Sequence, residues 1–280
     1  MSRKGLYTTT KELLISTPLP LQTRTYKPVS HEELINLTLE SIYQAGFQLD
    51  REIYDSAKEG QVATGRFLIK SVEDAEMQLQ VSWQNSYNKS LTLTFAVGAL
   101  VKVCTNGMMA MRGVGSFRKK HQGEIQTFAP QMIPEYIKGA GELFSDLQKD
   151  RDSMKQVQLS KRDTAELVGR MYIEEGLVES TQLNIIKREL EHPSIIYNNP
   201  GSMWELYNFT TFALRDSHPS LWLDNHVKIH EFFNSQAVER TNSAFFDYDM
   251  TGDIQIPEVV NDGQLTIFDE LNRQEREAGE

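Results

Sequence analysis

The stretch from Val101 to Gly123 holds the three residue types with which thiol hydrolases work, including the only cysteine of the chain. Cys104 would be the nucleophile, His121 the general base and Asn106 the group that orients the histidine. The spacing does not show that the three converge. Cys104 follows an apolar run, and Asn106-Gly107 predicts a tight turn. A small buried thiol at a strand end is therefore favoured, with catalysis as the alternative.

Charge indicates a second kind of chemistry in the same part of the chain. Residues 77–123 contain no Asp or Glu, although the chain has 39 of them. Candidates for contacts with phosphate groups are Lys102, Arg112, Arg118, Lys119, Lys120 and His121, and Lys89 adds a further cation. Candidates for stacking on bases are Trp83, Tyr87 and Phe117. We therefore predict nucleic-acid binding, with single strands favoured; a solvated basic loop is the alternative.

The C-terminal end carries the opposite charge, with ten acidic residues from Asp247 to Glu280 against Arg273 and Arg276. A basic face with an acidic tail is typical of nucleic-acid-binding proteins. The start of the tail, FDYDMTGDIQIPEV, also approaches the calcium loop of an EF-hand. Its candidate ligands are Asp247, Asp249, Asp253 and Glu258. Thr251 stands where the loop needs Asp or Asn, and Pro257 disfavours the exiting helix, so a plain acidic loop is favoured.

Five residues of the tail, Gln264-Leu265-Thr266-Ile267-Phe268, resemble the peptide with which bacterial DNA polymerases and repair proteins dock on the sliding clamp. Gln264 would bond polar groups at the rim of a pocket, and Leu265, Ile267 and Phe268 would fill it. A mobile tail would let the folded body act at a distance from the clamp ring. The alternative, slightly favoured, is an edge strand or a short helix packed on the body.

His226 and His230 lie four residues apart, a spacing that two zinc ligands on one helix can have. Their segment, HVKIH, lacks the Glu of the metalloprotease motif, and no third ligand is evident. A pair of histidines on a helix surface is the favoured interpretation. The sequence also lacks a Walker loop and a nucleophile elbow. We expect no cofactor and no resident metal, and a binding protein is favoured over an enzyme.

The elements that must hold these residues change in type along the chain. Three prolines and little periodicity predict an extended N-terminal arm over residues 1–30. Ser30 and Glu33 form a capping-box pattern before a helix that reaches Gly46. Period-two patterns then predict strands within FQLDREIYDSA, QVATGRFLIKSV, MQLQVSWQNS and SLTLTFAVGALVKV, the last two joined by a hairpin loop at YNKS.

Beyond Pro134 the apolar spacing becomes helical. The predicted helices are 134–158, 160–175, 180–191, 202–216 and 220–239. Strands first and helices afterwards predict an α+β fold with an antiparallel sheet of about four strands. We divide the chain into four parts: the arm, a helix and sheet with the basic loop over 31–130, a helical region packed on it over 131–246, and a mobile acidic tail over 247–280.

Two motifs resemble the family called domain of unknown function 932, which occurs in phages and plasmids. VKVCTNGMMAMRG followed by FRKKHQG matches the family's strand into Cys-x-Asn and its basic stretch ending in His. SMWELYNFTTFALRDSHPS matches its helix with Trp, an aromatic-Asn pair, Thr and a closing His, and departs from it at Phe209, at Phe212 and in the longer stretch before the His. The motif residues are Cys104, Asn106, Gly107, Trp204, Tyr207, Asn208, Thr211 and His218. The resemblance covers about residues 23–233 and implies a mobile-element protein without a settled activity.

Composition limits the compartment and the partners. One cysteine excludes an internal disulfide framework and favours a reducing compartment. No stretch approaches the roughly 20 apolar residues of a membrane helix, so we expect the cytoplasm of the host cell and no membrane. We predict an accessory protein of DNA metabolism, in annealing or recombination, with single-stranded nucleic acid, a sliding clamp and further copies of itself as partners. The alternative is a non-enzymatic interaction protein that binds a host or phage protein through its tail, without DNA affinity.

Overall fold

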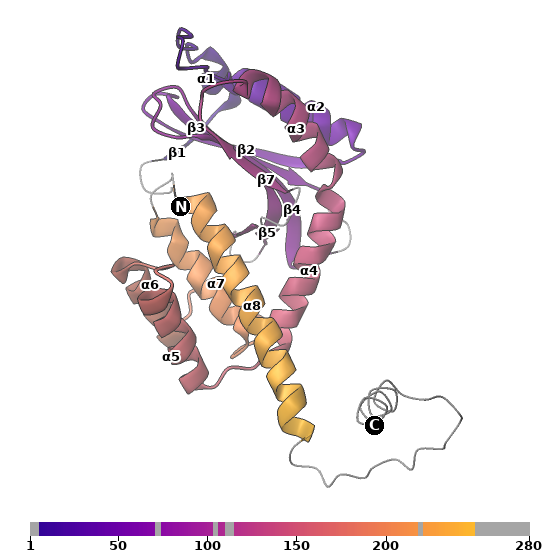
Figure 1. Cartoon of the computed structure of the whole chain (residues 1–280), viewed down its shortest axis with the longest axis vertical. Coiled ribbons are helices and arrows are strands. Elements are labelled where there is room, and N and C mark those ends of the chain that lie inside the picture. Colours follow the sequence, from indigo (N-terminus) through magenta and orange to yellow (C-terminus); the bar gives the residue numbers. More distant parts are fainter. Residues whose placement is uncertain (1–5, 71–73, 103–105, 110–114, 218–220, 250–280) are drawn as a thin grey trace, which may run out of the picture. The chain divides into compact units, whose positions relative to one another are not determined.

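The computed structural model describes residues 6–70, 74–102, 106–109, 115–217 and 221–249. The chain divides into two compact units, residues 1–241 and 242–280. The first unit holds the sheet and the helices that surround it (Figure 1), and the description below concerns this unit. The region predicted over residues 31–130 and residues 131–241 of the helical region predicted over 131–246 lie inside it.

A seven-stranded antiparallel sheet forms the first half, in the order β1-β2-β3-β4-β5-β6, with β7 also paired to β5. The four strands predicted from period-two patterns are present: β2 Leu49–Ala57, β3 Val62–Ile69, β4 Met77–Ser86 and β5 Leu93–Val101. The sequence did not reveal β1 Tyr7–Thr9, β6 Asn106–Met109 and β7 Ser116–Lys119. The prediction of an α+β fold with an antiparallel sheet is confirmed, with more strands than expected.

The segment predicted as an extended arm contains regular structure. β1 pairs with β2, and α1 Lys11–Ser16 follows it, capped by the Thr10 side chain, which accepts from the backbone N–H of Leu13. The predicted turn at Asn106-Gly107 is wrong, because these two residues already pair in β6 with Val101 and Leu100 of β5. A dipeptide that tolerates a turn is also compatible with a strand end when its neighbour offers a free edge.

The two faces of the sheet differ in chemistry. One face is apolar and packs on α2 His31–Gln44 and α3 Ile125–Lys138, which cover it in Figure 1. The helix α2 begins at the predicted capping box of Ser30 and Glu33. The opposite face, here called the polar face, carries small and polar side chains from three adjacent strands, because residues directly opposite in a ladder share a face. The polar face consists of Thr64, Arg66, Gln80, Ser82, Gln84, Thr94, Ala96 and Gly98, and the buried Leu68 lies on it opposite Gln80.

A glycine on the apolar face makes room for the indole of Trp83. Gly65 lies directly opposite Trp83 in the ladder, and a Cβ atom at this position would come within 2.5 Å of the indole atom Cε2. We therefore expect Gly65→Ala to lower the free energy of unfolding by about 1–3 kcal/mol through overpacking. Urea denaturation measures this loss. Gly169→Ala is the control, because its Cβ meets nothing within 4 Å and the helical backbone favours alanine. Equal stabilities of the two variants would contradict the packing argument.

The second half is helical, as predicted, with corrected boundaries. Its elements are α4 Ala140–Gln156, α5 Lys161–Gly169, the π-helix η1 Arg170–Glu174, α6 Ser180–Glu191, α7 Met203–Ala213, the 3-10 helix η2 Leu214–Asp216 and α8 Trp222–Asp249. The helix predicted to start at Pro134 is instead two helices that meet at Gly139, and Pro130 and Pro134 both lie inside α3. Buried side chains of α4, α5, α6, α7 and α8 form a second core together with Met77, Ala99 and Val101 of the sheet.

Asp74, which precedes β4, joins the sheet to α4. One carboxylate oxygen accepts the backbone N–H groups of Glu76 and Met77 at 2.8 Å each. The other accepts from Gln148 at 2.7 Å and from Arg151 at 2.5 Å, both on α4. These bonds hold the pKa of Asp74 near 2 although burial alone would raise it. The Asp74 carboxylate therefore stays charged at neutral pH and fixes the sheet against α4.

Candidate nucleic-acid interface

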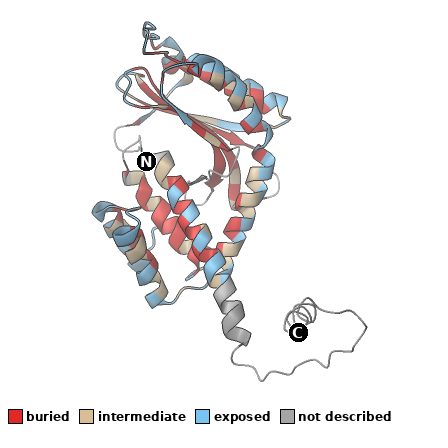
Figure 2. Ribbon diagram, in the orientation of Figure 1, coloured by how far each residue is buried: buried red, intermediate tan, exposed pale blue. Residues whose placement is uncertain are grey.

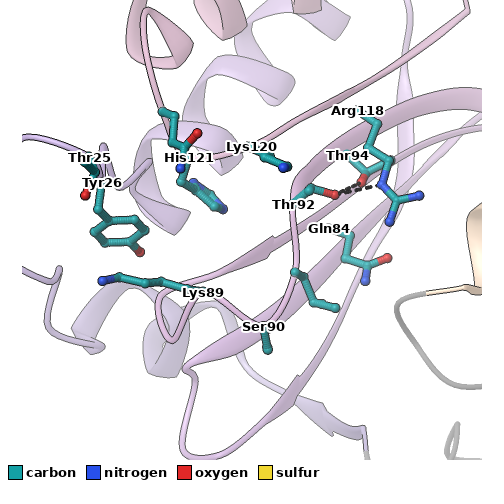
Figure 3. A pocket seen from close by; sticks show the side chains of 12 residues that line it. Thr25, Tyr26, Gln84, Lys89, Ser90, Thr92, Thr94, Arg118, Lys120 and His121 are labelled. Atoms are coloured by element: carbon teal, nitrogen blue, oxygen red, sulfur yellow. Dashed lines mark hydrogen bonds between the residues drawn. The ribbon is translucent and has the colours of Figure 1, made fainter.

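A pocket of about 330 Å³ opens where the loop between β4 and β5 meets the end of β7 (Figure 3). We call it the hairpin pocket. Its wall combines three cations with hydroxyl, amide and aromatic groups, and no Asp or Glu is among the described residues that line it. The lining residues are Thr25, Tyr26, Gln84, Lys89, Ser90, Leu91, Thr92, Thr94, Arg118, Lys120, His121 and Gln122.

Local backbone chemistry places the cations of the hairpin pocket. Lys89 has a left-handed φ of 64°, and Asn88 stabilises this turn because its side-chain oxygen accepts the backbone N–H of Ser90 at 3.0 Å. Arg118 lies directly opposite Thr94 in the pairing of β7 with β5. Its Nε atom donates to the Thr92 hydroxyl at 3.0 Å, as Figure 3 shows. The hairpin and β7 therefore bring Lys89 and Arg118, 29 positions apart in the sequence, to one pocket.

The N-terminal segment supplies the aromatic wall of the hairpin pocket. The backbone N–H of Lys27 donates to the His121 carbonyl at 2.8 Å, which ties this segment to the chain beyond β7. The Lys89 ammonium lies 4.6 Å from the centre of the Tyr26 ring, and His121 meets the same ring edge-on. Burial lowers the pKa of His121, although the nearby backbone of Lys27 and Leu91 opposes the shift. His121 is thus neutral at pH 7, and the positive charge of the pocket comes from the lysines and Arg118.

Arg118 is shared with the helical half. It forms an ion pair with Asp224 of α8, and its side chain is 45% exposed. An exposed pair of this kind contributes little to stability and exchanges readily with other anions, because water and salt screen it. Loss of the Asp224 contact would therefore cost the fold little stability. Sequence reasoning could not find Asp224, which lies 106 positions away.

The predicted stacking surface is wrong, because all three aromatic side chains are buried. Trp83 lies on the apolar face and is 2% exposed. Tyr87 stacks on His31 with ring centres 3.9 Å apart, and its hydroxyl accepts the backbone N–H of that residue. Phe117 stacks on Phe95 and meets Phe128 of α3 edge-on. None of these rings is free to receive a base. Tyr26 is the aromatic residue that lines the pocket, and it too is largely buried, at 5% exposed.

Two other predicted phosphate contacts, Lys102 and Lys119, do not line the hairpin pocket. The Lys102 ammonium donates to the backbone carbonyl of Asp74 at 2.6 Å, a structural contact. Lys119 is exposed and lies 4.6 Å from the centre of the Phe128 ring. Arg112 lies outside the described residues. Of the predicted set, Arg118, Lys120 and His121 come together, and Lys89 joins them from the hairpin.

The second family motif serves the interior where the structure describes it. Trp204 and Asn208 are buried in α7, and the Asn208 amide donates to the Trp204 carbonyl at 2.8 Å. Trp204 also stacks on Tyr207. Asn106 and Gly107 belong to β6, while Cys104 and His218 lie outside the described residues. The structure therefore does not test the arrangement of Cys104, Asn106 and His121 that thiol chemistry would need.

The histidine pair on α8 is buried, so its predicted position on a helix surface is wrong. His226 and His230 are each 1% exposed, and His230 Nε2 lies 3.0 Å from a carboxylate oxygen of Asp150 on α4. Within the described ranges, no group of three His, Cys, Asp or Glu side chains is placed to hold a metal ion.

The acidic tail falls largely outside the described part of the chain. Of the calcium-loop candidates, Asp247 and Asp249 belong to α8, whereas Asp253 and Glu258 are not described. The clamp-like residues Gln264, Leu265, Ile267 and Phe268 also lie outside. The calcium and clamp predictions therefore stay predictions.

The fold and the pocket define an α+β protein with a cationic, hydroxyl-rich pocket at one end of an antiparallel sheet. The family profile described as Domain of unknown function (DUF932) matches residues 18–238, and the chain belongs to this family. Neither the curated proteins nor the solved structures contain a match. Among the residues that the structure describes, no helix is both long and apolar enough to cross a membrane.

Proposed function

We propose that this protein is a phage or mobile-element accessory protein of DNA metabolism that binds single-stranded nucleic acid through phosphate contacts in the hairpin pocket. The carrying observation is the meeting of Lys89, Arg118 and Lys120 in one pocket whose described lining contains no carboxylate. Ammonium and guanidinium groups neutralise phosphates and release the counterions of the strand. The hydroxyls of Ser90, Thr92 and Thr94 supply further hydrogen bonds to phosphate oxygens.

Burial of the predicted stacking residues shapes this proposal. Because Trp83, Tyr87 and Phe117 cannot receive bases, affinity has to come mainly from the phosphate contacts. Three cations on a single strand give a slope of about −2 in a plot of log affinity against log salt. Affinity is then expected to fall by about tenfold to twentyfold between roughly 50 and 200 mM salt. Fluorescence anisotropy of a labelled oligonucleotide measures both values.

A double variant tests the pocket directly. Lys89→Glu with Lys120→Glu reverses two of its charges, and we expect it to weaken binding by about tenfold or more and to flatten the salt slope. The matched control is Lys138→Glu with Lys161→Glu, the same change in net charge at two exposed sites on α3 and α5. Absence of binding at low salt contradicts the proposal. Equal weakening by the two double variants also contradicts it, because binding would then follow net charge alone.

We further propose that the C-terminal tail binds a sliding clamp. We also propose that the protein acts in the cytoplasm. Deletion of residues 259–280 separates the two roles. If the protein binds strands with its body, the truncated chain keeps its affinity for the oligonucleotide. If it is instead an interaction protein that acts through the tail, the full-length chain does not bind the oligonucleotide, and the deletion removes binding of the partner protein.

A further inference from the structure

The polar face of the sheet is buried, although polar side chains such as these usually lie on the protein surface. Thr64 is 5% exposed, Gln80 1% and Ser82 5%. In an antiparallel sheet, an alternation of apolar and polar residues normally directs the polar side chains to water. Figure 2 shows the central strands largely buried. Burial of polar side chains without hydrogen-bond partners costs free energy on folding.

Three buried polar atoms of this face have no hydrogen-bond partner among the described residues: Thr64 Oγ1, Arg66 Nε and Gln80 Oε1. Native proteins rarely leave buried donors and acceptors unpaired, and a cluster of them calls for an explanation. Here the three residues lie on two adjacent strands and point to the same side of the sheet. A bound molecule that pairs with them would account for the cluster.

Neighbouring side chains orient two of these groups. The Asp55 carboxylate accepts from Arg66 Nη2 at 3.0 Å, which fixes the guanidinium and leaves Nε–H as a donor. The Ser82 hydroxyl accepts from Gln80 Nε2 at 2.8 Å, which leaves the amide oxygen as an acceptor. Thr64 adds a hydroxyl that can donate or accept. The unpaired set is thus one donor, one acceptor and one group of either kind.

The polar face continues into the hairpin pocket. Thr64, Gln84 and Thr94 form one row across three strands, and the last two also line the pocket. Along β5 the face has the small residues Thr94, Ala96 and Gly98, followed by Leu100, and all four are buried. At about 3.3 Å per residue, Arg66 lies about 7 Å and Gln80 about 13 Å beyond this row. The unpaired groups therefore lie on the face that continues from the pocket, within about 13 Å of its row along the strands.

We propose that the polar face receives the base of a nucleotide whose phosphate is held in the hairpin pocket. A nucleobase edge presents a donor beside an acceptor, and proteins that take a base out of a stack read this edge with side chains of these types. The inference rests on the proposed function, because it takes the pocket cations as the phosphate site. It adds that the chain recognises a base as well as a phosphate.

Binding of single nucleotides tests the inference without a strand. Isothermal titration with each of the four nucleoside 5′-monophosphates is compared with ribose 5-phosphate, which lacks the base. We expect at least one nucleotide to bind about tenfold tighter than ribose 5-phosphate, the lower end of what a good pair of base contacts gives. Thr64→Val with Gln80→Leu should bring the two affinities together. Thr127→Val with Gln131→Leu, the same changes on the exposed surface of α3, should keep the difference.

The outcomes separate this inference from the proposed function. If oligonucleotides bind but no nucleotide binds better than ribose 5-phosphate, the base site is overturned and phosphate binding stands. If a nucleotide binds with the expected preference but oligonucleotides do not bind, the strand-binding function is overturned and the base site stands. If neither binds, both fall. Should the double variant fail to fold by circular dichroism, Thr64→Val alone, which exchanges a hydroxyl for a methyl group, carries the same expectation.

Discussion

Replacing Asp74 with alanine is expected to lower the free energy of unfolding by about 3–5 kcal/mol, because it leaves a buried guanidinium without its main partner. The side chains of Asp74 and Arg151 are 5% and 11% exposed. The variant also loses the acceptor of two backbone N–H groups at the start of β4. Asp152 still accepts from Arg151 at 2.8 Å, which places the expected loss toward the lower end of this range. The total free energy of unfolding of a globular protein is about 5–15 kcal/mol, so the expected loss is a large part of its stability.

Urea denaturation at neutral pH, followed by circular dichroism, measures the effect. Asp74→Asn keeps an acceptor for the backbone N–H groups of Glu76 and Met77 but loses the charge that faces Arg151, so its loss is expected to be smaller than that of alanine. Asp146→Ala is the control, since its ion pair with Lys149 is on the surface of α4. If the urea midpoint of Asp74→Ala were as high as that of Asp146→Ala, the Asp74 carboxylate would not hold the sheet against α4 as we propose.

Acidification below neutral pH is the second large expected effect, and His31 is its main source. The ring is fully buried; its Nε2 donates to the Gly60 carbonyl at 3.0 Å, and its Nδ1 accepts from the Asn85 amide at 3.1 Å. Burial lowers the pKa of His31 from 6.5 to about 4. A proton on Nδ1 would break the bond from Asn85 and place a charge in the core. The folded protein therefore keeps His31 neutral where the unfolded chain has already bound a proton.

The sign of the pH dependence follows from this difference. Stability is full above pH 6.5 and falls as the pH drops toward about 4. At about 1.4 kcal/mol per pKa unit, the loss from His31 amounts to about 3 kcal/mol. His121, whose pKa burial also lowers, adds a loss in the same direction. Asp74 acts in a separate window, since its contribution is present above pH 3.8 and disappears toward about pH 2.

Urea midpoints at several pH values between 7.5 and 4 test the role of His31. His31→Phe keeps a ring against Tyr87 but does not titrate, so the variant is expected to be less stable at pH 7 and less sensitive to acid. His192→Phe, at an exposed position after α6, should keep the full pH dependence. An unchanged slope in His31→Phe would show that other groups cause the acid sensitivity.

Much of the fold could be predicted because the sheet and most helices are encoded locally. The strands β2, β3, β4 and β5 follow from alternating side chains, and α2 starts at the capping box of Ser30 and Glu33 that the sequence shows. The short strands β1, β6 and β7 could not be predicted, because each is stabilised by a partner strand and not by its own pattern.

The site was harder to predict because its side chains belong to segments far apart in the sequence. The alternation of side chains along β4 did contain a usable signal. Trp83 lies on the face of Val81, opposite to that of Gln80, Ser82 and Gln84, and this position indicates burial in the core. Charge alone could not show that Arg118 would meet Asp224 or that Lys102 would bond the carbonyl of Asp74. The burial of His226 and His230 depends on the packing of α8, which their spacing does not encode.

The lengths of the outermost strands bear on self-association. The sheet ends at β1 on one side, with three residues, and at β6 and β7 on the other, with four residues each, all paired inward. A long, flat edge offers a row of free backbone groups on which another chain can add and start aggregation. Each of these short strands by itself offers little template for this, and the edge along β5 is divided between β6 and β7. If copies of this protein do assemble, as annealing along a shared strand would require, we expect side-chain surfaces to join them and not a continuous sheet through neighbouring molecules.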